Sequence, residues 1–235
     1  MNKQKGDMYD FVKYTSNPIK GPCEHDCKYC YMKRINAFNG SNEILHLDLN
    51  ELYANHGSGN SFMMGSNTDT HAALVPTGWI KCMYDKCLMH EDNTYLFQSK
   101  NPGRFLEEEL MQHPLMQEKD RITFVTTIES NREHNVSKAP CIQERVKAMV
   151  KLRELGYKVA VTIEPIMDFD HDSLVEMLRK IKPFQVNIGC NTNREVKLQE
   201  PTRGQIVTLV QELRTFTKVE LKSNSSRILG DLSNI

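Results

Sequence analysis

Three cysteines lie close together near the N-terminus, where Cys23, Cys27 and Cys30 form a Cys-x3-Cys-x2-Cys pattern. Thiolates at this spacing on one tight loop can reach three corners of an iron–sulfur cubane, whose irons take cysteine ligands. Three protein ligands to a four-iron cluster leave one iron open to another group, and an open coordination position favours catalysis over a structural role. We therefore predict a [4Fe-4S] cluster on the loop spanning residues 18–31.

A structural zinc site is the alternative interpretation of these cysteines, with His25, Cys82 or Cys87 as the fourth ligand. Structural zinc sites usually take their ligands as two dyads, and no second Cys-x2-Cys follows here. On one helix, Cys82 and Cys87 would be rotated about 140° from each other, which suits a shared ion poorly. A zinc-stabilised module would bind nucleic acid or protein without catalysis. A cluster that only transfers electrons is a third possibility.

The composition indicates one globular domain over residues 1–235. A chain of 235 residues, 39% of them hydrophobic, is long enough for one substantial core and short for two. Thirty basic and thirty acidic residues give no net charge, which argues against tight nonspecific binding to DNA. No apolar run is long enough to cross a membrane, and the crowded cysteines fit a reducing compartment, so we expect a cytoplasmic protein.

Strand-like and helix-like segments alternate from residue 61 to residue 222. The expected strands are short β-branched or aromatic runs at 61–66, 95–99, 122–127, 159–164, 185–190 and 219–222, with an earlier strand near 11–16. Helical periodicity is clearest at 141–155, around Leu174 and Leu178, and around Leu209. This alternation predicts an α/β fold with a parallel sheet, either doubly wound or an incomplete barrel, and leaves a C-terminal tail at 223–235.

Polar residues cluster where these strands end. In both architectures the functional site lies at the carboxyl ends of the strands, so side chains from successive strands should meet at one rim. The residues in question are Gly65, Ser66, Asn67, Thr68, Lys100, Thr126, Glu129, Glu164, Asn187 and Cys190.

The cysteine spacing, with the aromatic Tyr29 just before the last cysteine, resembles the signature of the radical SAM superfamily. The stretches SNPIKGPCEHDCKYCYMKR, FMMGSNTDT, TYLFQSKNPGRF and TIEPIMDF resemble a phage-type family of three-cysteine-motif radical SAM proteins across most of the chain. A more distant likeness is to spore photoproduct lyase. The resemblance implies an incomplete (β/α)6-type parallel barrel, a partial TIM barrel, with the cluster loop after the first strand. A phage-encoded protein would act in the host cytoplasm.

The resemblance also implies the chemistry. In the superfamily the open iron binds S-adenosylmethionine (SAM), and one-electron reduction cleaves SAM to a 5'-deoxyadenosyl radical that abstracts hydrogen from the substrate. An external reductant of the flavodoxin or ferredoxin type supplies the electron. The favoured substrate is a nucleobase or a modified nucleotide in DNA, while a peptide or a small metabolite stays open. The sequence indicates no oligomeric state.

Cofactor contacts follow by position. The superfamily commonly holds the SAM amine with Gly-Gly-Glu after its second strand, and this chain departs from that pattern with Gly65, Ser66, Asn67 and Thr68, which an ordinary turn would also explain. Ribose contacts are expected from Thr126 and Glu129, and a further cofactor contact from Asn187. Tyr29 would pack on adenine or shield the cluster.

Three residues are candidates for the reaction itself. Lys100 could contact a carboxylate or phosphate, Glu164 could serve SAM or the substrate, and Cys190 could return a hydrogen atom to a product radical. The simpler alternatives are a solvated lysine, a structural ion pair and a small buried hydrophobic side chain.

Overall fold

A curved sheet organises the protein. The computed structural model describes residues 2–3, 8–33, 35, 44–193, 195–232 and 235. The strand order is β1-β2-β5-β6-β7-β8-β9-β10, in which β1 pairs antiparallel with β2 and every later neighbour is parallel. The bounds are β1 Asn2–Lys3, β2 Tyr14–Ser16, β5 Ser61–Met64, β6 Thr94–Gln98, β7 Ile122–Thr127, β8 Lys158–Ile163, β9 Gln185–Ile188 and β10 Lys218–Leu221.

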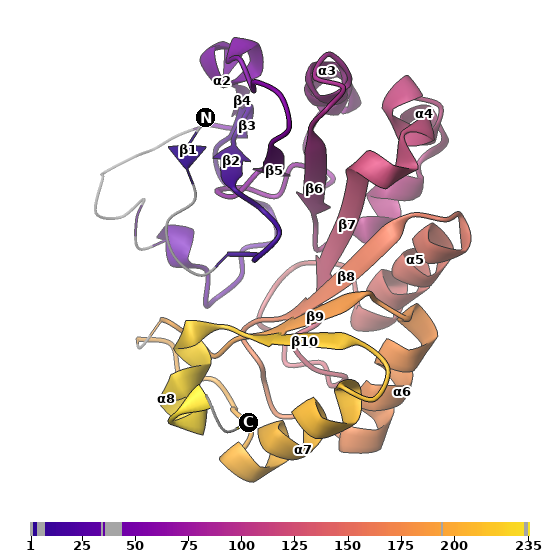
Figure 1. The fold of residues 1–235 in the computed structure, drawn as a ribbon. Coiled ribbons are helices and arrows are strands. Elements are labelled where there is room, and N and C mark those ends of the chain that lie inside the picture. The colour runs from indigo at the N-terminus through magenta and orange to yellow at the C-terminus, as the bar shows by residue number, and fades with distance from the viewer. Residues whose placement is uncertain (1, 4–7, 34, 36–43, 194, 233–234) are drawn as a thin grey trace.

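The predicted α/β fold with a parallel strand series is confirmed. Figure 1 shows the strands following one another in an open arc, and β2 and β10 stand apart in the strand order, so the barrel is not closed between them. Each expected strand from residue 61 onward matches an observed one within two residues, because short apolar runs that end in polar residues can be buried only as strands of a covered sheet.

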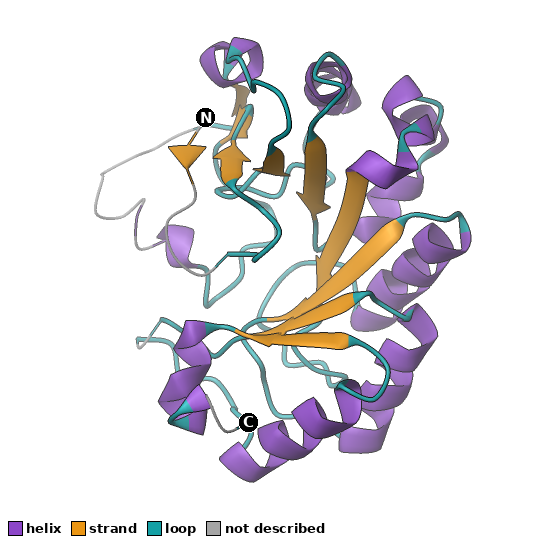
Figure 2. Ribbon diagram, in the orientation of Figure 1, coloured by secondary structure: helices purple, strands orange, loops and turns teal. Residues whose placement is uncertain are grey.

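Helices cover the outside of the arc (Figure 2). The longer ones are α3 Thr77–Leu88, α5 Ile142–Glu154, α6 His171–Ile181 and α7 Arg203–Leu213. Each buries one apolar stripe, as Leu174, Leu178 and Ile181 of α6 show. Thr202 caps α7 by accepting from the Gln205 amide, while the Gln205 side chain accepts from the Thr202 amide. Short elements complete the connections, namely α2 Leu49–Tyr53, α4 Glu108–Met111, α8 Ser226–Leu229 and the 3-10 turns η1 Pro102–Leu106, η2 Pro114–Gln117, η3 Lys119–Arg121 and η4 Ser223–Ser225.

The N-terminal segment fills the concave side of the sheet. Tyr9 and Val12 pack there against Met63, Leu96 and Val125. The strand expected near 11–16 is therefore shorter than its sequence suggests, because residues 9–12 turn into the barrel, with the Val12 amide donating to the Tyr9 carbonyl at 3.0 Å, before β2 begins.

The cysteine loop follows β2, as expected. A small antiparallel pair flanks the loop, with β3 Ile19–Lys20 before the cysteines and β4 His46–Leu47 after them. Residues 31–33, directly after the last cysteine, are helical. The segment expected to be a simple tail carries η4 and α8. The described residues include no helix with the length and apolar character that a membrane crossing requires.

Candidate functional site

A cavity of about 370 Å³ opens at the carboxyl edge of the sheet. Four of the seven cysteines line it: the three of the predicted cluster motif and Cys190. The remaining lining comes from the N-terminal segment, the residues after β5 and the ends of β6, β7, β8, β9 and β10. The cavity is therefore the place where the strand-end residues meet the cysteine loop.

The cysteine loop is folded by two tight turns. The Asp26 amide donates to the Cys23 carbonyl at 3.3 Å, and the Cys30 amide donates to the Cys27 carbonyl at 3.2 Å. The segment at 136–138 anchors the loop from outside, with Lys28 N to Val136 O at 2.8 Å and Lys138 N to His25 O at 2.7 Å. These turns fold the loop back on itself, so that its three thiols line the same cavity.

Burial opposes ionisation of two of these thiols. It raises the pKa of Cys23 to about 12, with the nearby Asp69 carboxylate adding to the effect, and it also raises the pKa of Cys27. Thiolate is the form that binds iron. A positively charged metal centre at the loop would favour the thiolate form of Cys23 and Cys27.

The three thiols of the cysteine loop line the cavity together. Thiolate is the ligand that iron–sulfur clusters take from proteins. Across the described ranges of the chain, no three His, Cys, Asp or Glu side chains converge closely enough to hold one metal ion. The loop thus offers the donor type of the predicted cluster.

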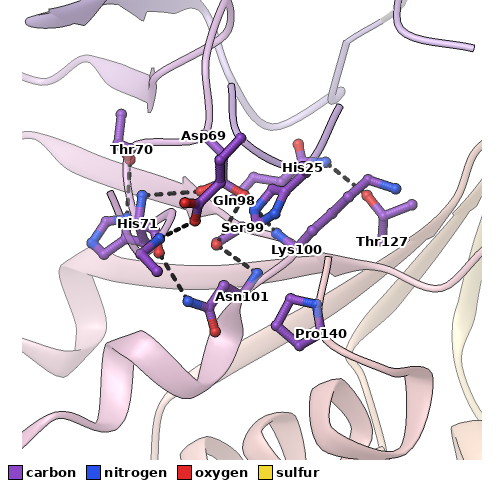
Figure 3. Close-up of polar contacts among 12 residues, drawn as sticks. His25, Asp69, Thr70, His71, Gln98, Ser99, Lys100, Asn101, Thr127 and Pro140 are labelled. Carbon is purple, nitrogen blue, oxygen red and sulfur yellow. Dashed lines mark hydrogen bonds and ion pairs between the residues drawn. The ribbon is translucent and has the colours of Figure 1, made fainter. Parts of the chain in front are cut away.

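Asp69 joins the cysteine loop to the rim (Figure 3). Its Oδ2 accepts from His25 Nε2 at 2.9 Å, from Ser99 Oγ at 3.0 Å and from the Lys100 amide at 2.8 Å, while Oδ1 accepts from the His71 amide at 3.0 Å. Burial raises the pKa of this carboxyl, but these donors outweigh it and hold the pKa below its usual range. The carboxylate fixes the cysteine loop against β6.

The segment after β5 approaches the cavity with its backbone. Gly65 has φ +86°, and a Cβ there would meet Thr70 Cγ2 at 2.3 Å, so only glycine fits. Asn17 Oδ1 accepts from the Ser66 amide at 2.7 Å and holds the turn. Asn67 Oδ1 and Thr68 Oγ1 are buried without a partner, although both residues line the cavity. A polar ligand would satisfy them.

A buried ionic network lies behind the cysteine loop. Glu129 Oε1 accepts from Lys100 Nζ and from the Tyr29 hydroxyl, while Oε2 accepts from Arg145 Nη1 at 2.9 Å. Arg145 also donates to the carbonyl of Thr127 at 3.0 Å. Burial raises the pKa of Glu129, but the two cations outweigh it and lower the pKa to about 2. With the Asp69 carboxylate, which accepts from the Lys100 amide, two cations and two carboxylates balance in this part of the structure.

A second ion pair lines the opposite side. Lys222 Nζ lies 2.9 Å from Glu164 Oε2, and Asn224 Nδ2 donates to Glu164 Oε1 at 2.7 Å. A Cβ on Gly189 would stand 2.7 Å from Glu164 Oε1, so this glycine makes room for the carboxylate. Asn224 Oδ1 accepts from the Cys190 amide at 3.0 Å, and burial raises the pKa of the Cys190 thiol to about 11. The thiol is thus held in its protonated form, with Sγ 4.0 Å from the Ser225 carbonyl.

Most of the residues expected at the site line the cavity, and three do not. The lining residues are Cys23, Cys27, Tyr29, Cys30, Gly65, Ser66, Asn67, Thr68, Lys100, Glu164 and Cys190. Glu129, 4% exposed, reaches the cavity only through Lys100 and Tyr29. Thr126 donates to the Ser99 carbonyl at 2.7 Å behind the wall, and Asn187 accepts from Gln185 Nε2 at 2.9 Å inside the barrel. None of these three residues lines the cavity, and their role in binding SAM stays a prediction.

Sequence reasoning missed several partners. Tyr9 and Lys222 line the cavity, while Arg145 and Asn224 donate to Thr127 and Glu164, which also line it. Arg145 lies on a helix face that could have been a solvated surface, and Asn224 lies in the segment taken for a tail. Only the position of Lys222 directly after a strand could have signalled its role.

No protein-family model and no curated protein sequence matches the chain, but solved structures do. A spore photoproduct lyase mutant has a TM-score of 0.65 at 12% identity, covering 93% of this chain and 78% of that one. Another, with bound AdoMet and dinucleoside spore photoproduct, has a TM-score of 0.57 at 14% identity, covering 91% and 64%. SuiB from Streptococcus suis bound to precursor peptide SuiA has a TM-score of 0.61 at 10% identity, covering 91% and 49%.

These neighbours are radical SAM enzymes. At such identities the likeness shows a shared fold, the partial barrel of these enzymes. The chain spans 64% of the length of the AdoMet-bound lyase and about half of SuiB.

Proposed function

We propose that this protein is a radical SAM enzyme in which Cys23, Cys27 and Cys30 bind a [4Fe-4S] cluster. One observation carries the proposal: a single cavity contains these three thiols, the glycine turn after β5 with its unpartnered polar atoms, and a fourth, protonated thiol. A cluster site that served only structure or electron transfer would have no use for the other features. The partial-barrel fold shared with radical SAM enzymes supports it.

The bound cluster and SAM would supply a 5'-deoxyadenosyl radical by one-electron cleavage of the cofactor. The chain's own residues position the cofactor. Asn67 Oδ1 and Thr68 Oγ1 would pair with its polar groups, and Gly65 would let backbone carbonyls approach its amine. The ammonium of Lys100, which lines the cavity, would attract its carboxylate.

On the other side of the cavity we infer a substrate site, with a nucleobase or modified nucleotide as substrate. The likeness to a lyase solved with a dinucleoside supports this choice. Cys190, whose thiol stays protonated, would return a hydrogen atom to the product radical. Cys82 and Cys87 lie on α3 outside the cavity, so neither would belong to a second cluster there. As in the radical SAM superfamily, a flavodoxin or ferredoxin would supply the electron.

The test is anaerobic reconstitution with iron and sulfide, followed by reduction in the presence of SAM. We expect about four irons per chain and release of 5'-deoxyadenosine, measured by mass spectrometry. Cys27→Ala should lose both, while Cys82→Ala, which removes a thiol outside the cavity, should keep both. Stoichiometric zinc in place of iron, or no cleavage above the Cys27→Ala level, would refute the proposal.

A further inference from the structure

The ion pair on the far side of the cavity has a fixed geometry. We name Glu164, Lys222 and Asn224 the Glu164 corner. Its carboxylate is oriented by Asn224 on Oε1 and by Lys222 on Oε2, and Gly189 leaves room for it, because a Cβ there would stand 2.7 Å from Oε1. Lys222 Nζ lies over the Tyr9 ring, 5.0 Å from its centre, in a cation–π contact. The corner therefore presents an acceptor and a donor in a defined arrangement.

The charge of this corner selects against anions. One carboxylate and one ammonium cancel, so the corner carries no net charge. A phosphate or carboxylate placed here would face Glu164 at close range and be repelled. The attraction within a partly buried ion pair often does not offset the desolvation of its two charges unless further hydrogen bonds form. A neutral group with one donor and one acceptor would supply such hydrogen bonds to both charged side chains.

The spacing of the pair identifies the kind of neutral group. Glu164 Oε2 and Lys222 Nζ lie 2.9 Å apart and both residues line the cavity, so a matching ligand carries its donor and acceptor side by side on one edge. A trans peptide unit directs its N–H and C=O to opposite sides and cannot reach both. The pairing edge of a nucleobase carries them next to each other in one rigid plane.

We propose that the Glu164 corner binds the edge of a nucleobase that carries a ring N–H beside a carbonyl, as in thymine and guanine. Glu164 accepts from the ring N–H and Lys222 donates to the carbonyl. Asn224 holds both Glu164 and the Cys190 backbone, so the same side chain places the base and the thiol together. The inference rests on the proposed function, because it treats this side of the cavity as the substrate side.

The adenine of SAM is the main competitor, because its amino group also lies beside a ring acceptor. If the corner bound that adenine, changes here would weaken the affinity for SAM itself. The affinity for SAM therefore separates the two assignments.

The experiment is anaerobic equilibrium dialysis of the iron-loaded, SAM-bound protein with thymidine and deoxyguanosine. N3-methylthymidine and N1-methyldeoxyguanosine, in which a methyl group blocks the ring N–H, should bind at least about tenfold more weakly, the effect of one lost charge-assisted hydrogen bond. This comparison needs no variant. Equal binding of blocked and unblocked nucleosides, or no binding of either, would overturn the inference.

Variants then locate the effect. Glu164→Gln and Lys222→Met should lower nucleoside binding at least about tenfold and leave SAM affinity within about twofold. The matched control is Glu220→Gln, which removes a carboxylate of β10 that pairs with Lys218 outside the cavity. Loss of SAM affinity in the corner variants would assign the corner to adenine, and Glu164-dependent binding of a capped dipeptide would assign it to a peptide; either result overturns the inference.

The same preparation is tested for 5'-deoxyadenosine release. Release without selective nucleoside binding would refute the assignment of the corner alone. Absence of iron and of release would refute the proposed function.

Discussion

Two glutamates beside the cavity each contact a lysine, yet they differ in burial and in the number of cations that bind them. At one end the side chain of Glu129, 6% exposed, is enclosed by Lys100, Arg145 and Tyr29. At the other, the side chain of Glu164 is 27% exposed and its bonds to Lys222 and Asn224 lie at the cavity wall. The hydrogen bonds of the Glu129 carboxylate all go to other residues of the protein, whereas the Glu164 carboxylate is partly exposed and can contact a ligand.

This difference separates positioning from recognition. A fully enclosed carboxylate with three donors holds the Lys100 ammonium and the Tyr29 ring where the cysteine loop needs them. The ion pair of Glu164 and Lys222 lies at the cavity wall, where both side chains can form hydrogen bonds with a bound molecule. Similar residues at two strand ends therefore serve different purposes, and substitutions can tell them apart.

The largest expected contrast in stability is between Glu129→Gln and Glu164→Gln. Loss of the Glu129 charge leaves two buried cations without their partner and should lower the free energy of unfolding by about 4 kcal/mol. Glu164→Gln should cost about 1 kcal/mol, because the site is partly hydrated and the glutamine oxygen can still accept from Asn224. Urea unfolding of the iron-free proteins measures both, and equal losses would contradict the distinction between the two ends.

Two glycines give the next comparison. Gly65→Ala introduces a Cβ at φ +86° and 2.3 Å from Thr70 Cγ2, so we expect a loss of about 3 kcal/mol and weaker binding of SAM. The Cβ of Gly189→Ala meets the carboxylate end of Glu164, which can move aside, so a loss of about 1 kcal/mol is expected with SAM affinity retained. Thermal unfolding and SAM dialysis test this order, and a reversed order would show that the Gly65 turn adapts.

The loss of stability in acid should report on the Glu129 carboxylate. The pKa of Glu129 is lowered to about 2, so its stabilising contribution is fully present well above the ordinary value near 4.5 and is lost as the pH falls through that value toward 2. Between pH 7 and pH 3 this one group should account for about 2 kcal/mol of lost stability. The comparison is the pH dependence of urea unfolding for the iron-free parent and Glu129→Gln. Parallel curves would mean that Glu129 does not carry the effect.

The smallest effect is expected from Thr126→Val. Its hydroxyl donates to the buried Ser99 carbonyl, so the change should cost about 1 kcal/mol. SAM affinity should be unchanged, because Thr126 lies behind the wall while Thr127 lines the cavity. A SAM dissociation constant raised tenfold would restore Thr126 as a cofactor contact.

The sequence alone predicted the strand series, the loop after the first strand and the thiols on it. These features depend on local signals. A short apolar run can be read without its neighbours, and the cysteine spacing defines a donor set within eight residues. The rule that parallel strands present their carboxyl ends to one edge then carried Lys100, Glu164 and Cys190 to a common site without any coordinates.

Tertiary structure decided what each of those residues contacts. Glu129 and Glu164 follow neighbouring strands and look alike in the sequence. However, Arg145 on α5 pairs with the first, and Asn224, 60 residues downstream, orients the second. Such long-range partners leave no periodic or spacing signal, because the contact depends on how helices and strand ends pack. The chain itself therefore determines where a cluster would bind, whereas only the fold separates the residues that hold the site from those that face a ligand.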